Sequence, residues 1–441
     1  MTARELALRV VCDVFPAAGT APERGAQASF DYRARRAQLS DRDRAFAAEL
    51  AYGAIKMRRT LDWHLEPFVG QRRQTLPQPI GEILRVAAYE LVYTRADVYA
   101  TVFEFVNLAK RCGHRGLANL VNAVLRTFLR EPRNEPHREL FESEEEYLGT
   151  RYSLPTWIVR QWREAFGALA EQICAGVNDP AQSGILIDLR KTTRDETAER
   201  LAALGIASRP SLVVPESLLL DASLSLLPVG EAAWQVQSES SAMAVDVLGP
   251  QPGEAILDVC SGRGNKAIQI ACRLRGDGTL TCIESDARKV AMLGRRLDSA
   301  GTIAAVVTGN AAESILPEAA AFDRALVDAP CSGTGVVGRH PEARWKKQGT
   351  DGERLAVTQR ALLEQTARHI HPGGVLVYAV CSTDPRETIE VMDWFLSRQN
   401  FERASVPATY EPFLTAGGDV LVPPGIDGRD GFYIARVQRR A

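Results

Sequence analysis

Features that would place this chain in a membrane, outside the cell or around a metal ion are scarce. No run of about 18 uncharged apolar residues occurs, so we expect no membrane-spanning helix. The eight cysteines form no CxxC pair and there are only six histidines, which argues against a zinc site and against a disulfide framework. The first residues lack the apolar core of a signal peptide. We therefore expect a reduced, cytoplasmic protein that holds no metal.

Net charge is also nearly absent, because 53 Lys and Arg stand against 55 Asp and Glu, a formal charge of −2. The charge is unevenly distributed, however. Residues 1–140 contain 22 Lys and Arg and 16 Asp and Glu, whereas the remainder contains 31 and 39. A basic first part joined to an acidic remainder can bring a polyanion to a site that is formed elsewhere in the chain.

Apolar residues at helical spacing predict an all-helical bundle over residues 1–140. The periodic runs cover residues 6–14, 43–65, 80–93 and 102–129. Lysine and arginine gather in three clusters, which either form a solvated surface or contact phosphate groups. These clusters are Arg33, Arg35 and Arg36; Lys56, Arg58 and Arg59; and Lys110, Arg111 and Arg115.

The rest of the chain predicts two further domains. An acidic run at residues 142–146 is typical of a solvated linker, and residues 150–230 predict a small α/β module. Over residues 235–441, short apolar strands alternate with helices, which predicts a doubly wound, mostly parallel sheet with helices on both faces. In the small module we expect helices at 157–166 and 195–204 and a strand at 185–189. In the last domain we expect strands at 256–259, 280–283, 304–307, 325–327, 375–379 and 432–437, with helices at 266–275 and 286–298.

A glycine-rich turn follows the first strand of this last domain. In ILDVCSGRGNKA, residues 256–267, an acid at the strand end precedes Gly262 and Gly264, where the backbone can pass close to a ligand and a helix N-terminus follows. Glu284 ends the next strand and suits hydrogen bonding to ribose hydroxyls. NAD-binding domains and S-adenosylmethionine-dependent methyltransferases share this pattern. Ala267 stands where NAD-binding domains have a third glycine, and a turn without a ligand is the remaining alternative.

Two cysteines follow two other predicted strands. DAPCSGTG, residues 328–335, contains Cys331, and AVCST, residues 379–383, contains Cys381. Because the carboxyl ends of strands line the ligand crevice of a doubly wound sheet, both thiols should face the cofactor. An NAD-dependent dehydrogenase would give them no role. The five cysteines expected to be buried core thiols are Cys12, Cys112, Cys174, Cys272 and Cys282.

LDVCSGRGNK, DAPCSGTG and AVCST together resemble the motifs of the RNA cytosine-C5 methyltransferases. The helical module, the linker and the final GIDGRDGFYIARV extend the resemblance over nearly the whole chain. A helical domain similar to the antitermination factor NusB, fused to such a core, resembles the bacterial ribosomal RNA small-subunit methyltransferase B family. The resemblance implies an RNA-binding NusB-like domain, a Rossmann-like catalytic domain and S-adenosylmethionine as cofactor. It implies methylation of C5 of a cytosine in 16S ribosomal RNA, the family's target being cytosine 967, by a protein expected to be a monomer.

The resemblance also assigns roles to individual residues. Cys381 would be the nucleophile that adds to C6 of the base, and Cys331 would assist proton removal or product release. Asp328 would hydrogen-bond the amino group and N3 of a base that must be unpaired or flipped. The expected cofactor-binding residues are Cys260, Ser261, Gly262, Arg263, Gly264, Asn265, Lys266, Glu284, Asn310 and Asp328.

The chain departs from the family pattern around the cofactor. Where the family usually has Pro-Gly-Gly-Lys, this chain has Arg263, Gly264, Asn265 and Lys266, so that a Cβ enters a crowded turn. Asn310 replaces an aspartate near the adenine and can still accept and donate one hydrogen bond each. Two alternatives follow: a catalytically weakened RNA-binding protein or chaperone, and an enzyme that acts on transfer RNA.

A basic and aromatic segment follows the Pro-Cys motif. Beside the catalytic strand, such a segment would bind phosphate and stack on bases; the alternative is a polar loop with one buried tryptophan. Its residues are Arg339, His340, Pro341, Arg344, Trp345, Lys346 and Lys347.

Overall fold

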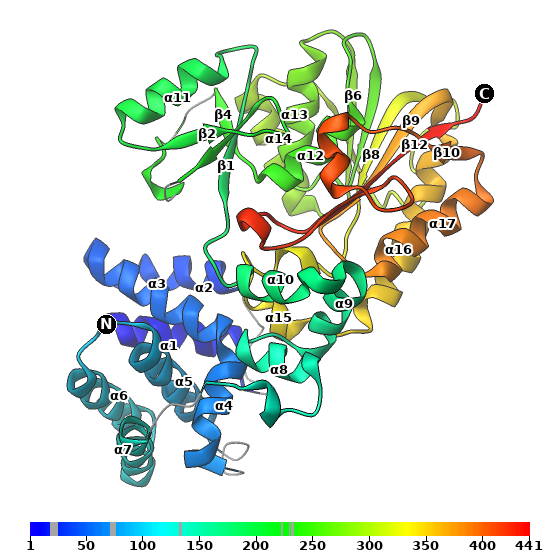
Figure 1. Ribbon diagram of the computed structural model, residues 1–441. Coiled ribbons are helices and arrows are strands. Elements are labelled where there is room, and N and C mark those ends of the chain that lie inside the picture. The colour runs from blue at the N-terminus through cyan, green and yellow to red at the C-terminus, as the bar shows by residue number, and fades with distance from the viewer. Residues whose placement is uncertain (18–24, 71–75, 132–134, 222–223, 229, 231–232) are drawn as a thin grey trace. The chain divides into compact units, whose positions relative to one another are not determined.

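The apolar periodicity of the first part of the chain forms a bundle of helices in the computed structural model (Figure 1). The structure describes residues 1–17, 25–70, 76–131, 135–221, 224–228, 230 and 233–441. Buried side chains such as those of Leu6, Leu50, Ile83 and Phe105 build one hydrophobic core. The helices are α1 (Ala3–Val14), α2 (Ala26–Ala34), α3 (Asp41–Lys56), α4 (Arg58–Val69), α5 (Gln78–Tyr93), α6 (Val98–Cys112) and α7 (Arg115–Arg130).

Two of the predicted helical runs are each broken into two helices. The run at 43–65 is interrupted at Met57, whose φ of −88° and ψ of 16° end α3 before α4 begins. The run at 102–129 is interrupted at Gly113, after which the His114 imidazole accepts a hydrogen bond from the Gly116 N–H at 3.2 Å and caps α7. Apolar spacing continues across both breaks, so the spacing alone did not reveal them.

The acidic run at 142–146 is not a solvated linker. It contains the start of α8 (Glu144–Arg151), where the Ser143 hydroxyl accepts a hydrogen bond from the Glu146 N–H at 3.2 Å. The Arg59 guanidinium donates to the Leu154 carbonyl at 2.7 Å and so holds the chain beyond this helix. The acidic residues favoured the linker prediction, but at a helix N-terminus they are stabilising.

One compact unit of the chain consists of residues 1–160 together with residues 339–347, and we call it the helical unit. The second segment contains α15 (Ala343–Lys346). The buried Arg344 guanidinium donates to the Ser153 carbonyl at 3.2 Å, and the Trp345 indole N–H donates to the Ile55 carbonyl at 2.7 Å. The prediction that Arg344 binds phosphate is therefore wrong, because its guanidinium is buried inside the helical unit, and the indole N–H of the partly buried Trp345 is also used there.

Carboxylates of the helical unit also bind several of its clustered arginines. The Arg33 guanidinium lies 2.6 Å from Asp13, and that of Arg58 lies 3.1 Å from the buried Glu82. These two side chains stabilise the fold, so the basic clusters are only in part a solvated or phosphate-contacting surface.

The second compact unit, residues 161–338 and 348–441, contains two sheets. The smaller sheet has the order β2-β3-β1-β4 with antiparallel pairing throughout. The predicted helices at 157–166 and 195–204 and the strand at 185–189 are confirmed within a few residues. The elements are α9 (Thr156–Phe166), α10 (Ala170–Gly176), β1 (Ser183–Ile187), α11 (Arg194–Ala203), β2 (Ser208–Pro210), β3 (Ser217–Leu220) and β4 (Trp234–Val236).

The larger sheet has the order β10-β12-β9-β8-β5-β6-β7, and β11 pairs with β12. Strands β7, β6, β5, β8 and β9 are parallel, whereas β12 is antiparallel to β9. The six predicted strands are present; β10 and β11 were not predicted. The elements are α12 (Glu239–Leu248), β5 (Ala255–Val259), α13 (Asn265–Leu274), β6 (Thr279–Glu284), α14 (Ala287–Ala300), β7 (Ala305–Thr308), β8 (Phe322–Asp328), α16 (Asp351–Arg368), β9 (Ile370–Val380), α17 (Ile389–Arg398), β10 (Phe401–Arg403), β11 (Val420–Val422) and β12 (Phe432–Arg439).

Successive residues of the central strands pack against helices on opposite faces of this sheet. Ile256 and Leu326 belong to the core under α12, α13 and α14, whereas their neighbours Leu257 and Val327 belong to the core under α16 and α17 (Figure 1). The sheet is thus doubly wound, and the carboxyl ends of its parallel strands lie at one edge. Among the described residues, no helix combines the length and apolarity needed to span a bilayer.

Candidate active site

The glycine-rich turn between β5 and α13 has left-handed backbone at three residues. The φ angles are +61° at Cys260, +58° at Gly262 and +87° at Gly264. A Cβ added at Gly262 would meet only the Cys260 carbonyl, at 3.8 Å, whereas one added at Gly264 would lie 2.6 Å from Leu293 Cδ1 of α14. Gly262 therefore leaves open space beside the turn, and Gly264 allows α14 to pack against it.

Two carboxyl groups lie at the ends of the strands next to this turn. Buried Glu284 accepts hydrogen bonds from the N–H groups of Gly262 and Asp286, each at 2.9 Å. Asp258 is fully buried, and within the described part of the chain neither of its carboxylate oxygens has a hydrogen-bond partner. Burial raises the pKa of Asp258 to about 7. Open space, a carboxylate at a strand end and an unpartnered carboxyl fit a ligand with hydroxyl and amino groups.

The other predicted cofactor residues lie around this turn. The Lys266 ammonium lies 2.6 Å from an Asp328 carboxylate oxygen and so joins the start of α13 to the end of β8. Buried Ser261 donates its hydroxyl to the Asp258 carbonyl at 2.9 Å. Asn310 follows β7, beside the end of β6, where its amide accepts from the Ala312 N–H at 3.1 Å. Arg296 of α14 contacts the carbonyl oxygen of Arg263 and the side-chain oxygen of Asn265.

The structure brings the two predicted catalytic cysteines together. Cys331 follows β8, Cys381 follows the parallel neighbour β9, and their sulfur atoms are 3.3 Å apart. The hydrogen bond with Cys381 and burial hold the pKa of the Cys331 thiol well above its usual range. Cys331 is therefore a protonated thiol that can donate to the sulfur of Cys381. Cys260 lies in the turn, where burial raises the pKa of its thiol to about 12.

One buried carboxylate joins the residues that follow both cysteines. Glu387 accepts hydrogen bonds from the Ser332 N–H at 2.9 Å and from the hydroxyls of Ser332 and Ser382, the latter at 2.6 Å. The Gln359 amide donates to Glu387 and to the Pro330 carbonyl, each at 3.0 Å. This cluster fixes the distance between the two cysteine loops from beneath the site.

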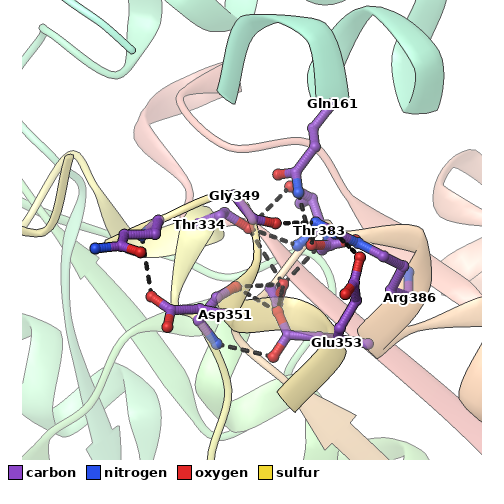
Figure 2. Close-up of polar contacts among 12 residues, drawn as sticks. Gln161, Thr334, Gly349, Asp351, Glu353, Thr383 and Arg386 are labelled. Atoms are coloured by element: carbon purple, nitrogen blue, oxygen red, sulfur yellow. Dashed lines mark hydrogen bonds and ion pairs between the residues drawn. The ribbon is translucent and has the colours of Figure 1, made fainter. Parts of the chain in front are cut away.

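Figure 2 shows how the remainder of the Cys381 loop is held. The Thr383 hydroxyl contacts that of Thr334 and accepts a hydrogen bond from the indole of fully buried Trp162 at 3.1 Å. Arg386 binds the buried Asp384 at 2.6 Å and reaches Glu353 of α16 at 3.1 Å. The loop is thus fixed on both sides of its backbone, which keeps the position of Cys381 defined.

Comparison with known proteins gives the same division of the chain. The model described as 16S rRNA methyltransferase RsmB/F matches residues 245–438, the NusB family model matches 1–130, and a ferredoxin-like domain of RsmF/B-like methyltransferases matches 154–226. A probable ribosomal RNA small subunit methyltransferase B of Bacillus subtilis is 32% identical over 417 residues, which cover 91% of this chain and 92% of the relative. The chain belongs to the ribosomal RNA small subunit methyltransferase B family.

Further relatives support this membership over the full length. A probable methyltransferase B of Synechocystis is 29% identical and covers 100% of both chains. Among solved structures, that of PH0851 has a TM-score of 0.80 at 21% identity and covers 100% of this chain and 99% of its own. That of NSun6 from Pyrococcus horikoshii with SFG has a TM-score of 0.59 at 17% identity, over 65% of this chain and 98% of its own. The two structures show the same fold.

As a member of the methyltransferase B family, the chain is an RNA methyltransferase with a NusB-like domain, and its cofactor is S-adenosylmethionine. The open space at Gly262 and the carboxyl groups of Asp258 and Glu284 fit this cofactor, which carries ribose hydroxyls and an amino group. Among the residues that the structure describes, no three His, Cys, Asp or Glu side chains are placed to hold a metal ion.

Sequence reasoning missed several side chains that shape this site. Glu387 is six residues beyond Cys381 and is a polar residue with no periodic signal, although an acid soon after a Ser-Thr pair could have drawn attention to it. Asp258 was noticed only as an acid at a strand end, and Arg296 was not singled out within the predicted helix at 286–298. Their roles depend on contacts across the fold, which spacing along the chain does not report.

Proposed function

We propose that this methyltransferase transfers a methyl group to C5 of a cytosine in small-subunit ribosomal RNA through a covalent bond between Cys381 and C6 of the base. The observation that carries the proposal is the 3.3 Å approach of the Cys331 and Cys381 sulfur atoms at the ends of two neighbouring parallel strands. The relatives are named for the ribosomal RNA, and the resemblance supplies the base and its family position, cytosine 967 of 16S ribosomal RNA.

The proposed chemistry requires a nucleophile because C5 of cytosine is too weakly nucleophilic to be methylated directly. The Cys381 thiolate adds to C6, and the electrons of the C5–C6 double bond make C5 reactive. S-Adenosylmethionine, when bound, would supply the methyl group to C5, with its methyl–sulfur bond broken and S-adenosylhomocysteine left as the second product. A base then removes the C5 proton, the double bond forms again, and the C6–S bond breaks to release the Cys381 thiolate.

The remaining residues have supporting parts in this proposal. Cys331, kept protonated, donates to the sulfur of Cys381 and stabilises it as it leaves C6. Asp328, held by Lys266, hydrogen-bonds the amino group and N3 of the flipped base. The cofactor would be held by the turn at 260–266, with Glu284 on the ribose and Asn310 near the adenine. Asp328 would lie between the cofactor and the flipped cytosine.

The activity is tested by incubating the protein and labelled S-adenosylmethionine with small-subunit ribosomal RNA from a strain that lacks the gene. We expect C5-methylcytosine at one position, which bisulfite sequencing identifies. Transfer RNA from the same strain serves as the parallel substrate. Methylation of transfer RNA alone would overturn the ribosomal substrate, and no C5-methylcytosine in either RNA would overturn the enzymatic proposal.

The roles of the two cysteines are tested by separate substitutions. Cys381→Ala should abolish both methylation and the covalent RNA adduct, whereas Cys331→Ala should let the adduct accumulate because release is slowed. Denaturing gels of the protein with labelled RNA distinguish these outcomes. Cys112, which was predicted to be buried, is an exposed thiol of the helical unit, so Cys112→Ala is the matched control and should behave as wild type. An adduct formed by Cys381→Ala would reverse the assignment.

A further inference from the structure

Arg296 of α14 contacts the glycine-rich turn through two of its nitrogen atoms. Its Nη1 donates to the Arg263 carbonyl at 3.0 Å and to the side-chain oxygen of Asn265. Its Nη2 donates to the side-chain oxygen of Gln235 at 3.0 Å. The guanidinium is half-buried, so water competes only in part for these hydrogen bonds.

Gln235 and Asn265 complete a closed set of hydrogen bonds between the turn and β4. The Gln235 amide donates to the Asn265 carbonyl at 2.8 Å, and the Asn265 amide donates to the Val236 carbonyl at 3.2 Å. The side chain of Asn265 is therefore bound to β4 and α14. The turn is thus anchored both to α14 and to β4 of the smaller sheet.

We propose that Arg296, Asn265 and Gln235 form a positioning unit that sets the affinity for S-adenosylmethionine by holding the turn in its binding conformation. The proposal rests on the proposed placement of the cofactor beside this turn. The backbone conformation of the turn is unfavourable without such contacts, because three of its residues are left-handed and one of them, Cys260, is not a glycine. A turn that is already ordered loses less conformational freedom when the ligand binds.

The positioning unit also explains a departure from the family pattern. A glycine at position 265 has no side chain to receive Arg296, whereas the asparagine here accepts from Arg296 and donates to β4. The Asn265 side chain is bound to Arg296 and to the Val236 carbonyl. Among the described residues, the only atom that a Cβ at Gly262 would meet within 4 Å is the Cys260 carbonyl oxygen, so the open space at Gly262 is kept. Asn265 and Arg296 therefore act as a pair, and the effect of changing one depends on the other.

Calorimetric titration of the full-length protein with S-adenosylmethionine tests this inference. Arg296→Ala should weaken binding about tenfold, and Arg296→Lys should restore part of the loss because an ammonium can still donate to one carbonyl. In an Asn265→Gly background, Arg296→Ala should have a clearly smaller effect. Arg295→Ala, on the exposed side of the same helix, is the matched control and should bind as wild type.

Steady-state kinetics give a second measurement that a general loss of stability would not reproduce. We expect Arg296→Ala to raise the KM for S-adenosylmethionine about tenfold while kcat at saturating cofactor changes less than about twofold. Gln235→Met, which removes the hydrogen bonds of Gln235 to Asn265, Arg296 and Gln237 but leaves Arg296 itself in place, should raise this KM as well and serves if Arg296→Ala does not fold. Unchanged affinity in both variants, or equal losses in Arg295→Ala, would overturn the inference. Wild-type protein that binds no S-adenosylmethionine would instead overturn the proposed cofactor site and the inference with it.

Discussion

At the scale of single residues, Asp258 is the group whose environment conflicts most with its chemistry. A carboxyl group buried without a hydrogen-bond partner disfavours its ionised form, and burial raises the pKa of Asp258 to about 7. The other acid beside the turn, Glu284, accepts hydrogen bonds from two backbone N–H groups, whereas the Asp258 carboxylate has no such partner among the residues that the structure describes. The ionised form of Asp258 is therefore destabilising at this site.

The stability of an Asp258→Asn variant should depend on pH in a definite direction. The folded pKa near 7 lies above the ordinary value of 3.8, so the contribution of Asp258 to the free energy of unfolding is fully present below pH 4, where the carboxyl is protonated in both the folded and the unfolded state. This contribution is then lost as pH rises through 7 and the buried carboxyl must ionise. The penalty reaches roughly 4 kcal/mol at most. The amide does not ionise, so the variant should gain in Tm relative to wild type between pH 4.5 and pH 8. A Tm difference equal at both pH values would contradict this account.

At the scale of elements, the site depends on how two parallel strands end. β8 and β9 place their loops side by side, and Glu387 with its serine partners sets the separation of the two sulfur atoms. Gly335 adds a backbone link, since its N–H donates to the Cys381 carbonyl at 3.1 Å. A Cβ at Gly335 would lie 2.1 Å from the Gly431 carbonyl oxygen, so this approach requires glycine.

Glu387→Gln should lower kcat by about 10- to 100-fold, because the neutral amide gives up charge-assisted hydrogen bonds and lets the cysteine loops move. The KM for S-adenosylmethionine should stay near the wild-type value, since the cofactor turn lies elsewhere on the sheet edge. Steady-state kinetics with both substrates measure the two effects. Glu390→Gln is the matched control, because that glutamate is exposed in the first turn of α17 and belongs to none of the contacts described for the cysteine loops. A wild-type kcat in Glu387→Gln would show that this carboxylate does not position the thiols.

Strong local patterns made much of this catalytic domain predictable from the sequence. The strands around residues 257, 282 and 326 are short apolar runs, and their carboxyl ends had to meet, which brought Cys331 and Cys381 together in the prediction. β10 and β11 have three residues each, too few for any period to show. Glu387 was missed because its partners include Ser332, 55 residues away, and only the folded sheet joins them.

At the scale of the whole molecule, the net charge of residues 1–140 was a poor predictor of which basic side chains are available to bind RNA. Arg33 and Arg58 bind carboxylates, Arg59 binds backbone and hydroxyl oxygens, and Arg344 is buried. From the sequence, these arginines were expected either to form a solvated surface or to contact phosphate groups. Their hydrogen bonds instead hold the helical unit together, so formal charge overstates the positive surface it presents.

Trp345→Phe should destabilise the helical unit by about 1 kcal/mol, because it removes one hydrogen bond to the Ile55 carbonyl and little apolar surface. Hydrogen exchange followed by mass spectrometry should show faster exchange in α3 than in wild type and unchanged exchange in the strands of the larger sheet. Trp394→Phe, a partly buried tryptophan of α17, is the control and should speed exchange near α17 alone. If the Trp345 variant exchanged equally faster in α3 and in the strands of the larger sheet, residues 339–347 would not stabilise the helical unit in particular.

The split composition of the helical unit has a consequence for biosynthesis. Residues 1–160 leave the ribosome first, but Arg344 and Trp345, which satisfy the Ser153 and Ile55 carbonyls, are translated only after the first strands of the larger sheet. The N-terminal helices must therefore wait with those carbonyls open to water until most of the polypeptide has been made. The helical unit is thus completed at nearly the same stage of translation at which the loop with Cys331 is synthesised.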